Sequence, residues 1–414
     1  MFVDSCQKNR RLSLYQQVFK NIYTHIIMSK HPSLWYTVIL PTLFFQLALS
    51  MGAPFIPLYA RELGSSLGLA TLMGAGVFFG QALLDLPGGW LVHRYGEKTI
   101  MVLGGLILLF SALLRLLIPH LLSLGLSILL TGAGTSLLWL ARMSWLKHEI
   151  RGVERGQAMS KVGGALRIAN IAGPLMGGFI AEHASYLSLF AAQGTLFLCS
   201  TAFMIWKVQP TPVPQVSYRL SIEKTHQVWQ KNWRNILAAG AGIAGLTVLR
   251  TSREILIPLW GKEVGLGEAL VGIVIFSGAL VDASFFWLSG LVMTRWGRKP
   301  AAIMCTVGLG LAIGLLPLAT GFVGLVALSC LAGLSNALGA GINLTISGDL
   351  APRQHPAAFL SLWRFFMGFA AFGGPALAAT TIRLVGESAA PPLMTFLGAI
   401  GVVVMGYGMR NHNK

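Results

Sequence analysis

The tripeptide Ile56-Pro57-Leu58 recurs 201 residues later as Ile257-Pro258-Leu259. The same offset pairs further residues: Glu62 with Glu263, Gly64 with Gly265, Gly132 with Gly333, Ser160 with Ser361, and Gly173-Pro174 with Gly374-Pro375. It also pairs two loops, Gly89-Trp-Leu-Val-His-Arg-Tyr-Gly-Glu-Lys98 and Gly290-Leu-Val-Met-Thr-Arg-Trp-Gly-Arg-Lys299. One register that holds over this length indicates that the chain contains two copies of one unit.

The composition places both copies in a membrane. The 414 residues are 54% hydrophobic and 11% charged, with a mean hydropathy of +0.68. A soluble domain carries about 25% charged residues, so a soluble globule is excluded. The 31 Lys and Arg residues lie in clusters between apolar runs, which is typical of membrane topology signals and not of a nucleic-acid site. Four cysteines exclude a disulfide scaffold, and we expect no disulfide.

Twelve apolar runs are long enough to cross a bilayer, which takes roughly 20 residues. They are Trp35–Ala60, Leu69–Val92, Thr99–Ile118, Leu121–Met143, Met159–Ala181, Leu187–Trp206, Ile236–Trp260, Ala269–Met293, Ala301–Thr320, Phe322–Ser347, Ala358–Ile382 and Pro392–Met409. The predicted fold class is therefore all-α and polytopic, with two parallel six-helix bundles, because six spans return the chain to its starting side.

The basic residues predict the orientation, since cytoplasmic loops are enriched in Lys and Arg. They cluster before the first span and in alternate loops: Lys8, Arg10, Arg11, Lys20, Lys30, Arg94, Lys98, Lys147, Arg151, Arg155, Arg219, Lys224, Lys231, Arg234, Arg295, Arg298, Lys299 and Arg353. Both termini should face the cytoplasm, in a multi-pass protein of the inner membrane. The polar N-terminal stretch is not a cleavable signal peptide, because a full-length span follows it.

Four regions follow from these spans: a basic cytoplasmic tail (1–34), an N-terminal bundle (35–206), a linker (207–235) and a C-terminal bundle (236–414). The linker opens rich in proline and becomes polar and basic, with room for a surface helix that carries Trp229 and Trp233. Parallel halves are a known plan for transporters, with the substrate site at their interface near the bilayer midplane.

The paired loops resemble motif A of the major facilitator superfamily, G-x-L-x-D-R-x-G-R-K. The matching residues are Gly89, Arg94, Gly96 and Lys98 in the first copy and Gly290, Arg295, Gly297 and Lys299 in the second. Gly173, Pro174, Gly177 and Gly178 are similar to the end of motif C, which that family associates with antiporters. The resemblance implies a transporter fold of twelve spans and favours a monomer.

The chain also departs from these motifs. His93 and Thr294 replace the acid of motif A, Ala169 replaces the first glycine of motif C, and Ile128 stands where the family often has an arginine. The family's proton pathway therefore cannot be transferred directly. The retained basic residues should still bind anionic headgroups or helix C-termini, and the glycines should let helices approach closely.

Ionisable residues at membrane depth indicate function, because they are costly there. The acids well inside spans are Asp85, Glu254 and Asp282, and the bases are Arg167, Arg250, Arg253 and Arg364. We expect three further arginines, Arg115, Arg142 and Arg383, to lie near span ends and extend to the headgroups. The three acids are the candidates for proton coupling.

Arg250 and Glu254 are four residues apart on the seventh span and share a face, with Arg253 beside them. Two arginines should keep Glu254 ionised. Two interpretations stay open: a switch in which a proton or substrate competes for the pairing, and a permanent ion pair that holds the helix.

Two crossed ion pairs are predicted between the halves. In the resembled fold span two packs on span eleven and span five on span eight, which would join Asp85 to Arg364 and Asp282 to Arg167. These pairs would close the cytoplasmic side of the outward-open state. The alternative is that each charge is satisfied within its own half.

The remaining candidates for the substrate cavity are the polar residues Gln46, Asn336 and Asn343, beside Arg250 and Arg253. Buried arginines outnumber acids by four to three, which leans towards an anionic substrate. No phosphate-binding G-x-x-x-x-G-K-[ST] loop, H-E-x-x-H motif or G-x-S-x-G motif occurs. We therefore expect no enzyme, cofactor or metal site.

The sequence thus predicts a secondary active transporter that exports a small organic molecule, such as a drug or a siderophore, by proton antiport and alternating access. Proton-coupled uptake is the alternative within transport. A transporter-like receptor or assembly protein that moves nothing is the alternative from another class.

Overall fold

The computed structural model describes residues 35–150, 153–210, 218–352 and 356–408. The predicted basic tail, Arg151, Arg353, part of the linker (211–217) and the last residues of the C-terminal bundle (409–414) lie outside the described residues. The elements are η1 (Trp35–Ile39), α3 (Leu40–Gly52), η2 (Ala53–Phe55), α4 (Ile56–Glu62), α5 (Leu67–Tyr95), α6 (Glu97–Leu117), α7 (Leu121–Glu149), α8 (Val153–His183), α9 (Tyr186–Lys207), α10 (Tyr218–Glu263), α11 (Glu268–Phe285), α12 (Trp287–Arg295), α13 (Arg298–Gly314), η3 (Leu316–Leu318), α14 (Phe322–Leu338), α15 (Ile342–Leu350), α16 (Pro356–Leu384), η4 (Glu387–Ala389) and α17 (Ala390–Gly408). Every regular element among these residues is helical, as the sequence predicts.

Ten helical segments of the described chain are long and apolar enough to cross a membrane. The predicted seventh span lies in α10, which is not among the ten, and the twelfth lies in α17, which contains a shorter apolar helix, Ala390–Gly406. The total of twelve therefore stays a prediction. Helix α10 runs without a break through the predicted linker boundary at 235/236.

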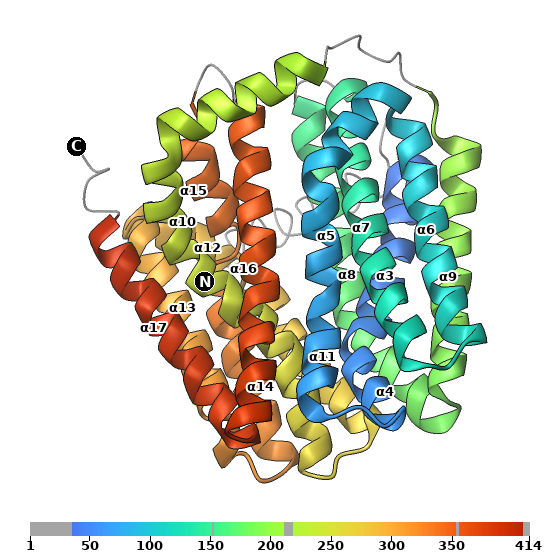
Figure 1. Ribbon diagram of the computed structural model, residues 1–414, viewed down its shortest axis with the longest axis vertical. Coiled ribbons are helices and arrows are strands. Elements are labelled where there is room, and N and C mark those ends of the chain that lie inside the picture. The colour runs from blue at the N-terminus through green and yellow to red at the C-terminus, as the bar shows by residue number, and fades with distance from the viewer. Residues whose placement is uncertain (1–34, 151–152, 211–217, 353–355, 409–414) are drawn as a thin grey trace, which may run out of the picture.

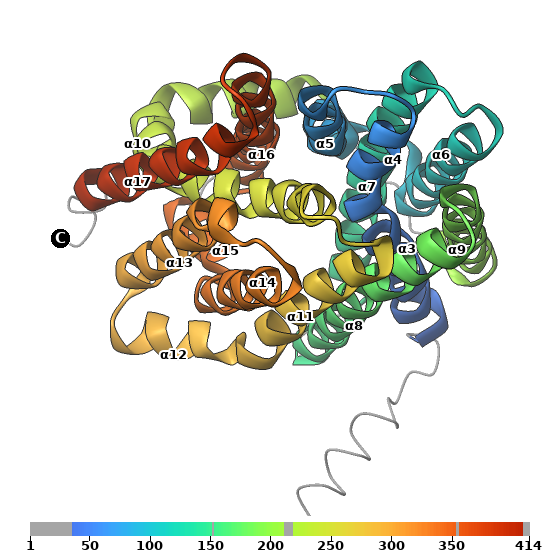
Figure 2. The ribbon, with the colours of Figure 1, turned by 90° about the horizontal axis from the view of Figure 1, so that it is seen from below.

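The described helices form two bundles that stand side by side, α3–α9 and α10–α17 (Figures 1 and 2). The bundles are parallel: Arg61 at the end of α4 and Glu263 at the end of α10 approach to 4.0 Å, so these equivalent turns lie at one end of the molecule. We call this the short-turn end. The opposite end, which carries the loops around Gly96 and Gly297, is the basic-loop end.

The repeat is visible in the backbone of four turns. Gly64 and Gly265 have φ values of +84° and +82°, and Gly96 and Gly297 have +82° and +91°. Only glycine adopts this region without strain, which explains why these four positions match at the offset of 201. The turns end α4, α10, α5 and α12, respectively, and reverse the chain between spans.

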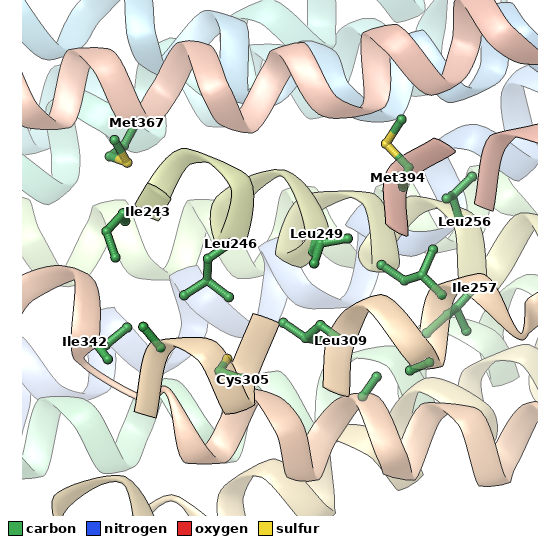
Figure 3. Packing of buried hydrophobic residues seen from close by; sticks show 14 of the residues in the cluster. Ile243, Leu246, Leu249, Leu256, Ile257, Cys305, Leu309, Ile342, Met367 and Met394 are labelled. Carbon is green, nitrogen blue, oxygen red and sulfur yellow. The ribbon is translucent and has the colours of Figure 1, made fainter. Parts of the chain in front are cut away.

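The hydrophobic core consists of three clusters, one within each half and one shared by both halves. Each half has its own apolar cluster; that of the C-terminal half surrounds α10 and includes Leu246, Leu249 and Leu309 (Figure 3). A third cluster is shared, because Ile255, Leu259 and other residues of the C-terminal half pack among residues of α3–α9. This shared cluster lies towards the short-turn end, so burial of apolar surface seals the two halves together there.

The two copies differ in their fourth helix. In the N-terminal half this is α7, an unbroken helix of 29 residues. In the C-terminal half the equivalent span is broken at Gly339-Ala340-Gly341, where Gly341 has a φ of +77°. At the offset of 201 the first copy has Leu138-Trp139-Leu140, which favour a continuous helix.

Candidate functional site

The interface between the halves is made mainly by two helix pairs, α5 with α16 and α8 with α11. These are the pairs that the resemblance predicts, spans two with eleven and five with eight. At the short-turn end they approach closely at glycines. A Cβ on Gly178 would lie 2.5 Å from the Glu268 carbonyl oxygen, and one on Gly272 would lie 2.6 Å from that of Pro174.

The Gly-Pro element of α8 also packs against the first span. A Cβ on Gly173 would lie 2.1 Å from Ser50 Oγ, and one on Gly177 would lie 2.2 Å from the Met51 carbonyl oxygen. The close-approach expectation therefore holds for Gly173, Gly177 and Gly178. It is wrong for Gly89 and Gly290, which have open space where a Cβ would stand.

Asp85 and Arg364 are brought together across the interface. Arg364 Nη2 donates to Asp85 Oδ1 at 2.9 Å, and Ser136 Oγ donates to the same oxygen at 2.5 Å. Asp85 is buried. The pair exists while the shared core seals the short-turn end, so it does not by itself mark a state that is open at that end.

Asp282 and Arg167 do not form the second predicted pair. The Arg167 guanidinium lies 3.7 Å from the centre of the Phe286 ring, and Asp282 Oδ2 accepts a hydrogen bond from Asn336 Nδ2 at 2.9 Å. The repeat explains the difference, because the residue equivalent to Asp85 is Phe286 and Asp282 lies one turn earlier. A cation–π contact thus replaces the ion pair at the second interface.

Glu254 occupies an unusual position on α10. Helices α5, α11, α13, α14, α16 and α17 all contact α10, and between residues 250 and 259 only Glu254 is exposed. Its carboxylate forms no hydrogen bond or ion pair within the described chain, although Arg253, Arg250 and Asp282 lie within electrostatic range. Ile255 and Leu259, which follow Glu254 on α10, belong to the shared core at the short-turn end.

The arginines beside Glu254 bind backbone oxygens instead of the carboxylate. Arg250 Nη2 donates to the Gly339 carbonyl at 2.8 Å, and Arg253 Nη1 donates to that of Ala332 at 3.1 Å. Of the two interpretations of this cluster, a permanent ion pair within the seventh span is therefore wrong for this conformation. The sequence did not predict that these two arginines donate to carbonyls of the tenth span, which contains α14 and the break after it.

The predicted polar residues of the cavity separate into different places. Asn336 joins the Glu254 cluster through Asp282, whereas Asn343 lies in α15 and accepts a hydrogen bond from Trp363 Nε1 at 2.7 Å. Gln46 donates to Asn170 Oδ1 of α8 at 2.8 Å. Asn170, which is exposed, was missed, although a polar residue one turn before the Gly-Pro element could have indicated it.

Arg115 and Arg142 do not extend to the headgroups, and that expectation is wrong. Their exposed fractions are 1% and 2%. Arg115 donates to Gln193, Ser111 and Thr131. Arg142 donates to Thr42 and lies over the rings of Phe45 and Trp139, and its Nε and Nη2 have no hydrogen-bond partner in the described part of the chain. Arg383 is exposed, as expected.

The motif loops act mainly within each half. Lys299 Nζ donates to the carbonyl of Gly406 near the end of α17 at 2.7 Å, as expected for a base at a helix C-terminus. Arg298 pairs with Asp349 at the end of α15. In the first copy Arg94 lies over the rings of Trp90 and Tyr95, and both Arg94 and its counterpart Arg295 are exposed.

A polar contact at the short-turn end was not predicted. Glu182 Oε2 of α8 accepts a hydrogen bond from the Ala269 backbone N–H, at 2.6 Å, in the first turn of α11. Gly267, the N-cap of α11, has no side chain to do this, and a Cβ there would lie 2.5 Å from Glu182 Oε2. Beside it Tyr186 donates to Glu268 at 2.9 Å, and Lys262 pairs with Glu268 at 2.7 Å.

Parallel helical repeats with ionisable residues at their interface define a class of protein, the secondary transporters with repeated bundles. The family model described as Major Facilitator Superfamily matches residues 38–253, slightly more than half of the chain. The chain therefore belongs to the major facilitator superfamily. This match confirms the resemblance. The family is one of transporters and not of enzymes.

Curated relatives match at low identity. The chain is 30% identical over 190 residues to the uncharacterized MFS-type transporter YuxJ of Bacillus subtilis (strain 168), covering 43% of this chain and 46% of that one. It is 25% identical over 330 residues to the synaptic vesicular amine transporter of Mus musculus, covering 76% and 60%. It is 29% identical over 181 residues to the multidrug resistance protein MdtG of Erwinia billingiae (strain Eb661), covering 42% and 43%. The matches span less than two thirds of the length of each relative.

Solved structures agree in fold. A crystal structure of peptide transporter POT in complex with sulfate superimposes with a TM-score of 0.74 at 14% identity, covering 92% of this chain and 94% of that one. An auto-inhibited POT family peptide transporter gives 0.75 at 12% identity, covering 92% and 97%. At these identities the likeness shows the fold alone.

Proposed function

We propose that this protein exports a small organic molecule in exchange for protons, by alternating access. The observation that carries the proposal is Glu254: an accessible carboxylate in the middle of the bundle that has no hydrogen-bond partner among the described residues. Such a group can hold a proton or a cationic group of a substrate, but not both. Mutual exclusion at one carboxylate is what proton antiport requires.

Two further observations support export. The Gly173-Pro174-x-x-Gly177-Gly178 element, which the family associates with antiporters, packs α8 on both the first span and α11. One relative is named a multidrug resistance protein. The basic-loop end would face the cytoplasm of the inner membrane, and the short-turn end, where the shared core lies, would face outside.

Proton-coupled uptake is the second candidate, and the count of interior charges favours it. With Arg115 and Arg142 buried, six arginines rather than four lie at membrane depth beside three acids. An anionic substrate would bind Arg253 best when Glu254 is protonated, so proton and substrate would enter together. The charge of the substrate therefore separates antiport from symport.

The test is transport in proteoliposomes with a proton gradient imposed in either direction. A panel of cationic, zwitterionic and carboxylate compounds is added, and both compound flux and internal pH are followed. Proton antiport predicts that the compound and the protons cross the membrane in opposite directions. Proton symport predicts that both cross in the same direction. No flux of any compound would favour the receptor or assembly protein.

Variants then assign the coupling residue. Glu254→Gln should retain downhill flux and lose proton-driven accumulation, whereas the matched control Glu62→Gln, at an exposed position, should keep both. Asp85→Asn and Asp282→Asn complete the set. If all three interior variants keep proton-driven accumulation, these acids are not the coupling residues.

A further inference from the structure

The break in the tenth span is held by the neighbours of Glu254. Where α14 ends, the Gly339 carbonyl accepts from Arg250 Nη2 at 2.8 Å. Ser289 Oγ donates to the next carbonyl, that of Ala340, at 2.6 Å. Backbone carbonyls at a broken helix need partners at membrane depth. The Gly339 carbonyl also accepts the Ile342 N–H at 3.1 Å, and Arg250 adds a charged donor from α10.

The Arg250 guanidinium is incompletely satisfied in this arrangement. Its Nε is buried and has no hydrogen-bond partner among the residues that the structure describes. Glu254 lies one helical turn further along α10, on the same face, with its carboxylate accessible and unpaired. A carboxylate is a stronger acceptor for a guanidinium than a backbone carbonyl is, because both partners are charged.

We propose that Glu254 controls the break in the tenth span through its protonation state. When Glu254 carries a proton, Arg250 stays on the Gly339 carbonyl and the break is fixed. When Glu254 releases its proton to water, the carboxylate accepts N–H groups of Arg250, including Nε, and the Gly339 carbonyl is released. The inference deepens the proposed function, since it rests on proton coupling at Glu254.

The charged groups around Glu254 support a competition of this kind. Arg253 and Arg250 on its own helix attract its ionised form, and Asp282 on α11 opposes it. Asp282 is itself tied to Asn336, in the last turn of α14. Both acids therefore lie next to the same break: Glu254 beside Arg250, and Asp282 bonded to the Asn336 amide.

Movement at the break would reach the ion pair between the halves. Helix α15 follows the break, and its Asn343 accepts a hydrogen bond from Trp363 of α16. The next residue, Arg364, holds Asp85 of the other half. A chain of contacts thus joins the break beside Glu254 to the interface between the halves.

The experiment is hydrogen–deuterium exchange of the full-length protein in nanodiscs, with no substrate, at pH 5 and pH 9. Exchange of amides 342–350 is expressed as protection, which removes the intrinsic effect of pH on exchange. In the wild type, protection should fall about tenfold from pH 5 to pH 9, the size expected for loss of one hydrogen bond from a charged donor. Glu254→Gln should keep the high protection at both values.

Two further variants keep the test decisive. Arg250→Gln should give low protection at both pH values, and Arg250→Met, which also lacks a charged donor, serves if that variant does not fold. The control Glu62→Gln should behave like the wild type. The proposal is overturned if the wild type shows equal protection at both pH values, or if Glu254→Gln retains the full difference.

This assay is independent of transport. A pH-dependent break in a protein that moves no compound would overturn the proposed function and leave the control by Glu254 standing. The opposite result is proton-driven transport that is lost in Glu254→Gln, together with equal protection of the break at both pH values. It would support the proposed function and overturn the control of the break by Glu254.

Discussion

Arg115 of the N-terminal half and Arg250 and Arg253 of the C-terminal half are held in opposite ways. In the N-terminal half Arg115 is 1% exposed and bonds to three side chains, from α6, α7 and α9. In the C-terminal half Arg250 and Arg253 bond to backbone carbonyls of a neighbouring helix that is broken nearby. Side-chain networks fix several helices at once, whereas one bond to a carbonyl can be exchanged. The difference indicates a rigid site around Arg115 and an adjustable one around Arg250.

Removing Arg115 should have the largest effect. Arg115→Ala leaves Gln193, Ser111 and Thr131 without their buried partner and creates a cavity, so we expect the free energy of unfolding to fall by about 3–5 kcal/mol. Thermal unfolding in detergent measures this. Arg250→Ala should cost clearly less, because it removes mainly one hydrogen bond, to a carbonyl that also accepts the Ile342 N–H. Equal losses in the two variants would contradict the comparison.

The backbone at the break gives the second prediction. Gly341→Ala places a side chain at a φ of +77°, which should cost about 1–2 kcal/mol of folding stability. The matched change in the first copy, Leu140→Ala, keeps a helix-favouring residue and should cost less. Unfolding midpoints of both variants provide the measurement. If Gly341→Ala is as stable as the wild type, the backbone conformation at the break does not require glycine.

The repeat explains what could be predicted from the sequence. The parallel halves follow from the offset of 201, and its Gly64, Gly96, Gly265 and Gly297 each occupy a left-handed turn. The pairing of Asp85 with Arg364 followed from equal depth on helices expected to pack together. These features depend on spacing along the chain, which a sequence displays directly.

Other features depend on which helix face meets which neighbour. Arg115 was expected at the headgroups because depth alone does not show that Gln193 and Thr131 surround it. Arg250 was expected to pair with Glu254 because the break at Gly339 was not considered. The signal was present, since Gly339-Ala340-Gly341 replaces Leu138-Trp139-Leu140 in the other copy.

The two helix interfaces give the third prediction. Asp85→Arg and Arg364→Asp should each impair transport and lower stability by about 1 kcal/mol, because Arg364 is partly exposed. The double variant Asp85→Arg/Arg364→Asp should recover most of the loss. A double-mutant cycle on transport rate and unfolding free energy measures the coupling. Absence of rescue would remove the proposed gating role of the pair.

At the second interface Arg167→Gln should have a smaller effect than loss of the ion pair. It removes a contact with the Phe286 ring that contributes about 0.5–1 kcal/mol at an accessible site. The control Phe286→Leu should give a similar loss, and the two changes together should cost no more than either alone. Additive losses would show that the arginine acts through another partner.

The smallest effect concerns the motif loops, whose sequences are most alike although their contacts differ. Lys299 Nζ donates to the Gly406 carbonyl, so Lys299→Ala should release the end of α17 and lower stability by about 0.5 kcal/mol. Lys98, its counterpart, has no corresponding hydrogen bond within the described chain, so Lys98→Ala should change stability by less. Exchange of the amides of residues 400–406 separates the cases, because release of α17 should be confined to Lys299→Ala. Equal exchange in the two variants would mean that the loops act alike, through the membrane surface that both are predicted to face, and that the asymmetry of the halves does not extend to them.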